Sequence, residues 1–336
     1  MAHAQKELLS GLLKDVSRSF YLTLRLLPGK VRPQIGLAYL LARTADTNAD
    51  TELVPLEQRR QSLQDLRARI LGTRAAPLEF GALARQQASP AERILLERCE
   101  ESLSLLQTLA PGDRRLVVEV LQTITSGQEL DLRRFGDASA KSVVALRTEA
   151  ELDDYTYRVA GCVGEFWTKI CRAHLFPEAA LDDALLLANG VRFGKGLQLV
   201  NILRDLPSDL RRGCCYLPAE RLAPLGLAPG DLLAPASEPR LRPFYDEYLD
   251  RAEGHLRAGW AYTNALPRGG VRLRLACSWP ILIGCETLKL LRTARVLDPG
   301  QRAKVSRKRL RQLILRSVCL YPWPRAWERQ VAAAPG

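Results

Sequence analysis

Apolar residues recur at spacings of three and four along almost the whole chain, and this periodicity constrains the fold more than any other feature. Side chains at this spacing line one face of an α-helix. A half-buried β-strand instead requires strict alternation of apolar and polar residues, and no segment of this sequence long enough to form a strand shows it. The pattern predicts helices over 34–50, 56–71, 90–109, 114–135, 149–174, 181–206, 242–266 and 273–297. We therefore expect an all-α protein.

Two stretches interrupt the helical pattern. Five prolines fall within residues 223–243, which predicts a long irregular connection, and residues 72–89 predict a second loop. Helical segments continue on both sides of the proline-rich stretch, and no internal repeat is visible. We therefore expect residues 1–336 to form one all-α domain with a site between facing helices.

Composition excludes several classes of protein. The 336 residues are 47% hydrophobic and 26% charged, as in ordinary globular proteins, and contain no run of 18 apolar residues that would predict a transmembrane helix. Because residues 1–15 lack the pattern of a signal peptide, we expect a cytoplasmic chain. The eight cysteines and three histidines show no zinc-ligand spacing, so we expect free, mostly buried thiols.

The formal net charge is +12, and residues 302–316 contain seven lysines and arginines. This basic segment is as consistent with a solvated helix face as with a binding surface. Nucleic acid, anionic lipid and phosphorylated small molecules are all partners that such a charge attracts.

The helix predicted after Pro33 carries a polar face. Tyr39, Arg43, Asp46 and Asp50 are spaced four, three and four apart, so they project from the same side. Two carboxylates one turn apart supply the oxygen ligands that hard divalent cations prefer. A solvated helix surface explains most isolated pairs of this kind, although it requires neither the tyrosine nor the arginine.

The 181–206 helix and its extension repeat this arrangement. Gln198, Asn201, Asp205 and Asp209 share a face, and the two amides interrupt an otherwise apolar run where unpaired amides are costly. Two carboxylate pairs on separate helices predict a site for divalent cations and for a diphosphate, whose charge Mg²⁺ would neutralise. Arg43 and Arg204 would contact phosphate oxygens.

Two further segments have a polar or small-residue character. In residues 155–169, Tyr155, Val159 and Val163 share a predicted face among small residues that favour either close helix packing or room for a long apolar ligand. The segment 17–20 (Ser-Arg-Ser-Phe) predicts either a helix cap or a set of phosphate donors. No Gly-rich dinucleotide fingerprint is present, so any nicotinamide cofactor is not held by a Rossmann fold.

Together these segments resemble the squalene/phytoene synthase family, the head-to-head prenyl diphosphate synthases. The matching strings occur in the family's order: Ser17-Arg18-Ser19-Phe20, residues 39–50, Tyr155 with residues 159–164, residues 198–209, and Tyr216-Leu217-Pro218. The resemblance covers roughly residues 17–218, with weaker similarity around 277–288.

The resemblance implies an isoprenoid-synthase helical fold around a central cavity. It implies that Asp46, Asp50, Asp205 and Asp209 bind Mg²⁺ that bridges two diphosphates, and that Tyr155 is catalytic in the first half-reaction. The residues that it places along the substrates are Arg18, Ser19, Phe20, Tyr39, Arg43, Val159, Val163, Gln198, Asn201 and Arg204. Phe20 and Phe166 are expected on the cavity wall.

The implied activity is that of a bacterial-type squalene synthase. Two farnesyl diphosphates condense to presqualene diphosphate, which NADPH then reduces to squalene, with Lys304 and Arg307 expected near the NADPH phosphate. Phytoene, dehydrosqualene and hydroxysqualene synthases, which share the metal motifs, are the alternatives, and a non-catalytic assembly partner is another. No nucleic-acid partner is expected, because no nucleic-acid recognition fold accompanies the positive charge, and this charge instead favours transient contact with anionic membrane surfaces.

The sequence departs from the family pattern at several positions. Ala49 and Ser208 stand where an acidic residue is common, so each motif keeps two carboxylates. Pro207 removes a hydrogen bond inside the second motif, which makes the position of Asp209 hard to predict. Cys214 and Cys215 follow Gly213 where an arginine is expected.

Overall fold

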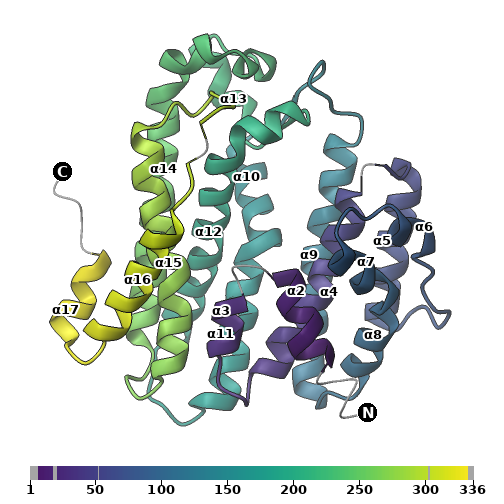
Figure 1. The fold of residues 1–336 in the computed structure, drawn as a ribbon, viewed down its shortest axis with the longest axis vertical. Helices are drawn as coiled ribbons and strands as arrows, with labels where there is room; N and C mark the ends of the chain where they lie inside the picture. The colour runs from purple at the N-terminus through teal and green to yellow at the C-terminus, as the bar shows by residue number, and fades with distance from the viewer. Residues whose placement is uncertain (1–6, 18–20, 52, 302, 332–336) are drawn as a thin grey trace. The chain divides into compact units, whose positions relative to one another are not determined.

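The structure is a computed structural model that describes residues 7–17, 21–51, 53–301 and 303–331. Nearly all of its regular structure is helical, which confirms the all-α prediction for this part of the chain (Figure 1). The chain divides into two compact units, residues 1–136 with 166–178 (unit 1) and residues 137–165 with 179–336 (unit 2). The single-domain organisation stays a prediction.

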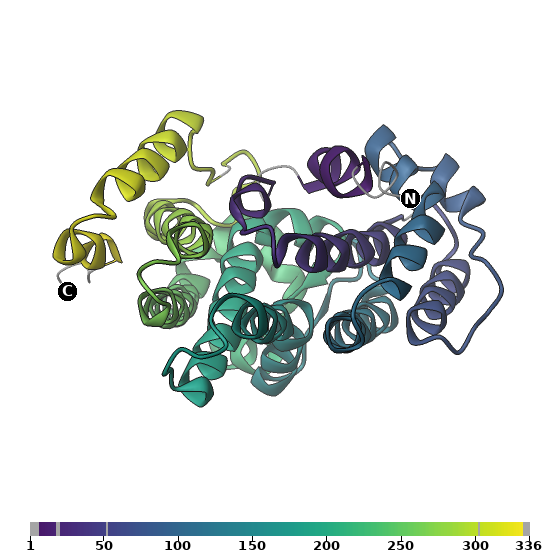
Figure 2. The ribbon, with the colours of Figure 1, turned by 90° about the horizontal axis from the view of Figure 1, so that it is seen from below.

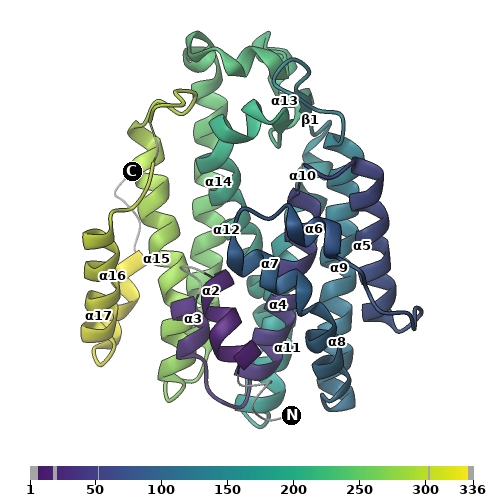
Figure 3. The same cartoon turned by 45° about the vertical axis from the view of Figure 1, so that its right-hand side comes forward.

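Unit 1 is built around one long polar-faced helix. Its elements are the π-helix η1 (Glu7–Leu12), α2 (Leu13–Ser17), α3 (Tyr21–Leu26), α4 (Arg32–Asp50), α5 (Leu56–Leu71), α6 (Gly81–Arg85), α7 (Pro90–Glu97), α8 (Cys99–Gln107), α9 (Pro111–Phe135) and most of α11 (Cys162–Leu175). Pro33 stands in the first turn of α4, where a missing N–H costs nothing. Leu37, Leu40 and Leu41 are fully buried as α4 packs against α9, α5, α7 and α8 (Figure 3).

Unit 2 has three long helices that pack together: α12 (Asp183–Arg211), α14 (Glu238–Ala265) and α15 (Val271–Thr293) (Figure 1). The other elements are β1 (Val144–Ala145), α10 (Glu149–Thr156), the π-helix η3 (Tyr157–Gly161), β2 (Cys214–Cys215), α13 (Ala219–Leu222), η4 (Ala223–Leu225), η5 (Pro229–Leu233), η6 (Pro235–Ser237), α16 (Arg307–Leu320), α17 (Pro324–Glu328) and η7 (Arg329–Val331). The two short strands pair in parallel, Val144 with Cys214. Helices α16 and α17, yellow in Figure 2, follow α15; α16 packs on α15, and α17 packs on α16.

The structure differs from the sequence prediction at helix ends and in the loop predicted over 72–89, which contains the short helix α6. The helix predicted over 90–109 breaks at Arg98 into α7 and α8, and the one predicted over 149–174 contains the π-helical turn η3. The proline-rich connection consists largely of 3₁₀ turns, and α14 already begins at Glu238, since Pro239 is tolerated in a first helical turn. No helix in the described ranges is both long enough and apolar enough to cross a bilayer.

Pro207 lies inside α12, and the helix continues past it to Arg211. Proline cannot donate to the carbonyl four residues earlier, which belongs to Leu203. The buried hydroxyl of Tyr245 on α14 donates to that Leu203 carbonyl oxygen at 2.8 Å. This replacement bond explains why the helix continues, so that Asp205 and Asp209 remain one turn apart.

Within unit 2, small residues bring α12 very close to η3 and to Gly164 in the first turn of α11. A Cβ atom on Gly164 would lie 1.9 Å from the Gly190 carbonyl oxygen, and one on Gly194 would lie 2.1 Å from the Ala160 carbonyl oxygen. No side chain fits at such distances. Of the two interpretations of the small residues, close helix packing is therefore the one observed at Gly164 and Gly194.

Candidate functional site

The first aspartate pair lies at the C-terminal end of α4, in unit 1. Asp46 is half-buried, and its Oδ1 atom accepts a hydrogen bond from Nε2 of Gln128 on α9. Asp50, the last residue of the helix, is exposed. Arg43, one turn before Asp46, forms an ion pair with Glu92 on α7. Residues of α9 and α7 thus contact the polar face that the sequence predicts for this helix.

The Asp46 carboxyl resists ionisation. Burial raises its pKa to about 6, and the Asp50 carboxylate adds to this effect, against the opposing influence of Arg43 and the hydrogen bond from Gln128. A divalent cation at this position would favour the ionised form and relieve the repulsion between the two carboxylates.

The second aspartate pair lies on α12, in unit 2, and arginines balance both carboxylates. Nε of Arg204 donates to Oδ1 of Asp205 at 2.9 Å, and Nη2 of Arg212 donates to Oδ1 of Asp209 at 2.6 Å. Asp209 is buried, and burial raises its pKa to about 6, although the Arg212 hydrogen bond and charge oppose this. Each pair thus contains one carboxyl group that burial makes reluctant to ionise.

Tyr155 lies at the end of α10, buried in unit 2. Its ring stacks on that of Tyr216, with centroids 4.6 Å apart, and its hydroxyl oxygen accepts a hydrogen bond from Nε2 of Gln198 at 3.4 Å. Nδ2 of Asn201 donates in turn to Oε1 of Gln198 at 3.4 Å. The structure therefore brings Tyr155, Gln198 and Asn201 together, whereas the helix pattern predicts only that Gln198 and Asn201 share a face.

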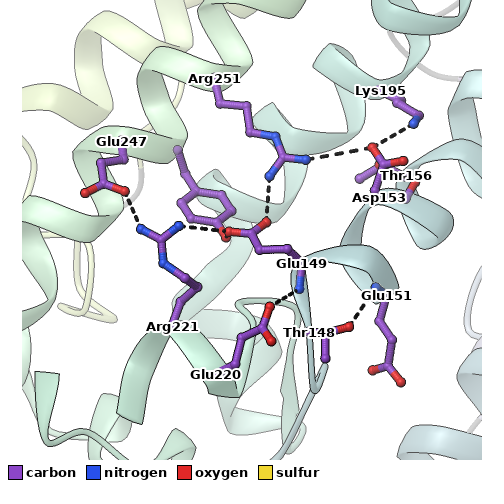
Figure 4. Close-up of polar contacts among 11 residues, drawn as sticks. Thr148, Glu149, Glu151, Asp153, Thr156, Lys195, Glu220, Arg221, Glu247 and Arg251 are labelled. Carbon is purple, nitrogen blue, oxygen red and sulfur yellow. Dashed lines mark hydrogen bonds and ion pairs between the residues drawn. The ribbon is translucent and has the colours of Figure 1, made fainter. Parts of the chain in front are cut away.

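An ionic network fixes the helix that carries Tyr155 (Figure 4). The Glu149 carboxylate at the start of α10 accepts hydrogen bonds from Arg221 at 3.2 Å, from Arg251 at 2.7 Å and from the Tyr248 hydroxyl. Farther along α10, Asp153 pairs with Lys195 of α12 at 2.7 Å. Links to α12, α13 and α14 therefore fix the position of the tyrosine.

The other predicted site residues have varied environments. Tyr39, Val159 and Val163 are half-buried, whereas Asn201 is exposed. Lys304 and Arg307 are exposed, and neither forms an ion pair with another residue of the described chain. Arg18, Ser19 and Phe20 lie outside the described residues. Phe166 is buried in unit 1.

Four contact residues of the site are absent from the sequence-based site assignment: Gln128, Glu92, Arg212 and Tyr216. Gln128 is 82 residues from Asp46, and Glu92 is 49 residues from Arg43, so no local pattern links them. Arg212, in contrast, is three residues after Asp209, a spacing that places it on the same helix face. That spacing is a signal from which it could have been found.

The donor set fits Mg²⁺ that is shared with a substrate. Among the residues that the structure describes, no group of three or more His, Cys, Asp or Glu side chains gathers into a metal site. Each pair offers two carboxylates, and Mg²⁺ is commonly held by one or two carboxylates together with water and substrate phosphates. Beside Asp46, the buried Oε1 atom of Gln128 accepts no hydrogen bond within the described ranges and is a further oxygen donor.

Comparisons with known proteins agree on one family. The family model described as squalene/phytoene synthase matches residues 13–309. The presqualene diphosphate synthase of Rhodopseudomonas palustris is 33% identical over 76% of this chain and 77% of its own length. That of Zymomonas mobilis is 28% identical over 75% of this chain and 74% of its own.

The fold has a counterpart among solved structures. A dehydrosqualene synthase in complex with a ligand superimposes with a TM-score of 0.67 at 22% identity, over 96% of this chain and 98% of that one. Identity this low supports the likeness of fold alone.

Proposed function

This chain belongs to the squalene/phytoene synthase family of prenyl-transferring enzymes, and we propose that it condenses two farnesyl diphosphates head to head into presqualene diphosphate. The observation that carries the proposal is the pair of Asp-x-x-x-Asp motifs on α4 and α12, each with one carboxyl group whose pKa burial raises to about 6. The names of the two curated relatives support this product.

We propose that Asp46, Asp50, Asp205 and Asp209 hold Mg²⁺. When bound, Mg²⁺ would neutralise the diphosphate charge that develops as the allylic C–O bond breaks. The leaving diphosphate takes the bonding electron pair, the double bond of the second substrate attacks the allylic cation, and loss of a proton closes the cyclopropane ring.

Arg43 and Arg204 are proposed to bind the diphosphates. Each guanidinium is paired with a carboxylate, Arg43 with Glu92 and Arg204 with Asp205. A diphosphate offers the same bidentate acceptor geometry with more charge. Substrate binding would therefore exchange a carboxylate for phosphate oxygens at each arginine.

Tyr155 is proposed to contact the reacting carbons of the first half-reaction. Gln198 and Tyr216 hold its hydroxyl and ring, and the ionic network around Glu149 fixes its helix. Such preorganisation directs the hydroxyl without a cost of reorganisation during the reaction. Tyr155→Phe should lower kcat far more than it changes KM for farnesyl diphosphate.

The direct test uses purified full-length protein with Mg²⁺ and farnesyl diphosphate, with mass spectrometry of the extracted products. Presqualene diphosphate formed without NADPH, and lost in Asp46→Asn and Asp205→Asn variants, is the expected result. Absence of turnover of both farnesyl and geranylgeranyl diphosphate would overturn the proposal.

The second candidate function continues the reaction to squalene with NADPH. The basic residues Lys304 and Arg307, exposed at the start of α16, favour it because they are placed to meet a phosphorylated cofactor from solvent. If it is correct, squalene appears only with NADPH, and substituting both residues with glutamine weakens NADPH use while presqualene diphosphate still forms. The same products with and without NADPH would exclude it.

A further inference from the structure

A small polar cavity lies in unit 2, away from the aspartate and tyrosine motifs in the sequence. It has a volume of about 70 Å³ and is lined by residues from the end of α14, the turn that follows, α15 and the α16–α17 segment. Its lining includes Asn264, Arg268, Arg274, Tyr321, Trp327 and Glu328. A cavity of this size holds several water molecules or one small oxyanion.

Arg274 is the unusual residue of this cavity, because only 5% of it is exposed. Nη2 donates to Oδ1 of Asn264 at 2.8 Å, and the guanidinium lies 5.6 Å from the ring centroids of both Tyr321 and Trp327. Its Nε atom is buried and donates to no acceptor within the described ranges. Burial accordingly lowers the pKa of this arginine.

The cavity has more positive than negative charge. Buried arginines are ordinarily paired with a carboxylate, yet neither Arg274 nor Arg268 has an ion-pair partner in the described part of the chain. Glu328 lines the cavity but is within ion-pair distance of neither arginine. Arg274 also lies in the first turns of α15, where the helix dipole adds positive potential.

We propose that this cavity binds a phosphate group through Arg274 and Arg268. A tetrahedral oxyanion supplies the countercharge that the buried guanidinium lacks, and it has the acceptor geometry that arginine forks prefer. The rings of Tyr321 and Trp327 lie beside the buried Arg274 guanidinium, and the low exposure of this group strengthens its interaction with an anion. The proposal does not depend on the proposed enzyme activity.

The ligand is either free phosphate or the phosphomonoester headgroup of a lipid. Trp323, which is 61% exposed, and Leu315 on α16 lie close in the chain to the cavity residues Tyr321 and Trp327. An exposed tryptophan and leucine beside basic residues are features of surfaces that contact membranes. The experiment therefore needs one arm for each source.

The first arm titrates the full chain with inorganic phosphate and, at equal ionic strength, with chloride. Trp327 lines the cavity, so its fluorescence reports occupancy, and calorimetry gives the affinity. We expect saturable binding of phosphate but not chloride, weakened by about tenfold or more in Arg274→Gln. Arg268→Gln, at an exposed position, should weaken binding without affecting folding, and Glu328→Gln should strengthen it.

Arg85→Gln is the matched control, because Arg85 is an exposed arginine of α6 that neither lines the cavity nor belongs to the basic segment of α16. The second arm compares phosphatidylcholine vesicles that contain phosphatidic acid with vesicles of equal charge that contain phosphatidylserine. Preference for phosphatidic acid that disappears in Arg268→Gln identifies the lipid headgroup, whereas binding in solution alone identifies free phosphate. Absence of binding in both arms, or equal loss in Arg85→Gln, would overturn the proposal.

Discussion

At the scale of single residues, the carboxyl groups of Asp46 and Asp209 should make the proposed metal binding depend on pH. Burial raises the pKa of each to about 6, and the Mg²⁺ that we propose for these residues would bind only the ionised form. As pH falls through about 6, protons compete with the metal; as pH rises above it, the competition ends. We expect the Mg²⁺ concentration for half-maximal rate to rise by about tenfold or more for each pH unit below this value.

This prediction is checked by measuring initial rates against Mg²⁺ concentration between about pH 5 and pH 8. High Mg²⁺ should recover most of the rate lost at low pH, because the loss reflects weaker metal binding and not unfolding. A Mg²⁺ requirement that does not change with pH across this window would show that neither carboxyl group titrates in metal binding.

The residues of the candidate site divide into those that a helix pattern predicts and those that only the fold brings near. Asp46 and Asp50 are four residues apart, so the sequence alone places them one turn apart on α4. Gln128, which donates to Asp46, is 82 residues away, and its contact exists only because α4 packs on α9. Contacts of this kind depend on tertiary packing, so no periodic pattern in the sequence predicts them.

At the scale of elements, the continuation of α12 beyond Pro207 depends on Tyr245. Tyr245→Phe removes the donor that satisfies the buried Leu203 carbonyl, so we expect unfolding free energy to fall by about 1–3 kcal/mol. Chemical denaturation of the wild type and the variant measures this loss. Because Asp205 and Asp209 flank Pro207, activity should fall as well.

The matched test is the double variant Tyr245→Phe with Pro207→Ala. Alanine restores the N–H that can donate to Leu203 within the helix, so the double variant should recover most of the stability lost in Tyr245→Phe. Additive effects of the two substitutions would show that the Tyr245 hydroxyl does not compensate for the proline.

Close packing between η3–α11 and α12 gives a second prediction at this scale. Gly164→Ala would place a Cβ atom 1.9 Å from the Gly190 carbonyl oxygen, so the helices must separate, and we expect a loss of about 2 kcal/mol or more. Gly254→Ala is the control, because that glycine also lies in a helix but has no atom within 4 Å of the added Cβ. The control should be stabilised by about 0.5–1 kcal/mol in thermal or chemical denaturation.

Helix pattern predicts the long elements well and the interruptions poorly. The periodicity locates α5 over 56–71 and most of α4, α12 and α14, because each buries a broad apolar face. It does not reveal the break at Arg98 or the π-helical turn at Tyr157–Gly161. Those features depend on which partner a helix packs against, and a single sequence does not contain that information.

At the scale of the whole molecule, the net charge of +12 and the exposed apolar residues of the C-terminal segment both favour contact with an anionic membrane surface. Leu315, Val318 and Trp323 are 65%, 45% and 61% exposed, and α16 also carries exposed basic residues at positions 307, 308, 311 and 316. Basic residues attract anionic headgroups, and an exposed tryptophan is stable at the membrane interface. We propose that this segment is the peripheral membrane contact of the chain.

The prediction is that the full chain sediments with vesicles of phosphatidylcholine and phosphatidylglycerol but not with phosphatidylcholine alone, and that salt weakens the association. Leu315→Ser with Trp323→Ser should lower the bound fraction several-fold, because both charge attraction and apolar insertion are needed for stable binding. Leu185→Ser, at a leucine of α12 that is 56% exposed, is the control and should bind as the wild type does. If the control loses as much binding as the double variant, the attraction is a property of the overall charge and not of the C-terminal segment.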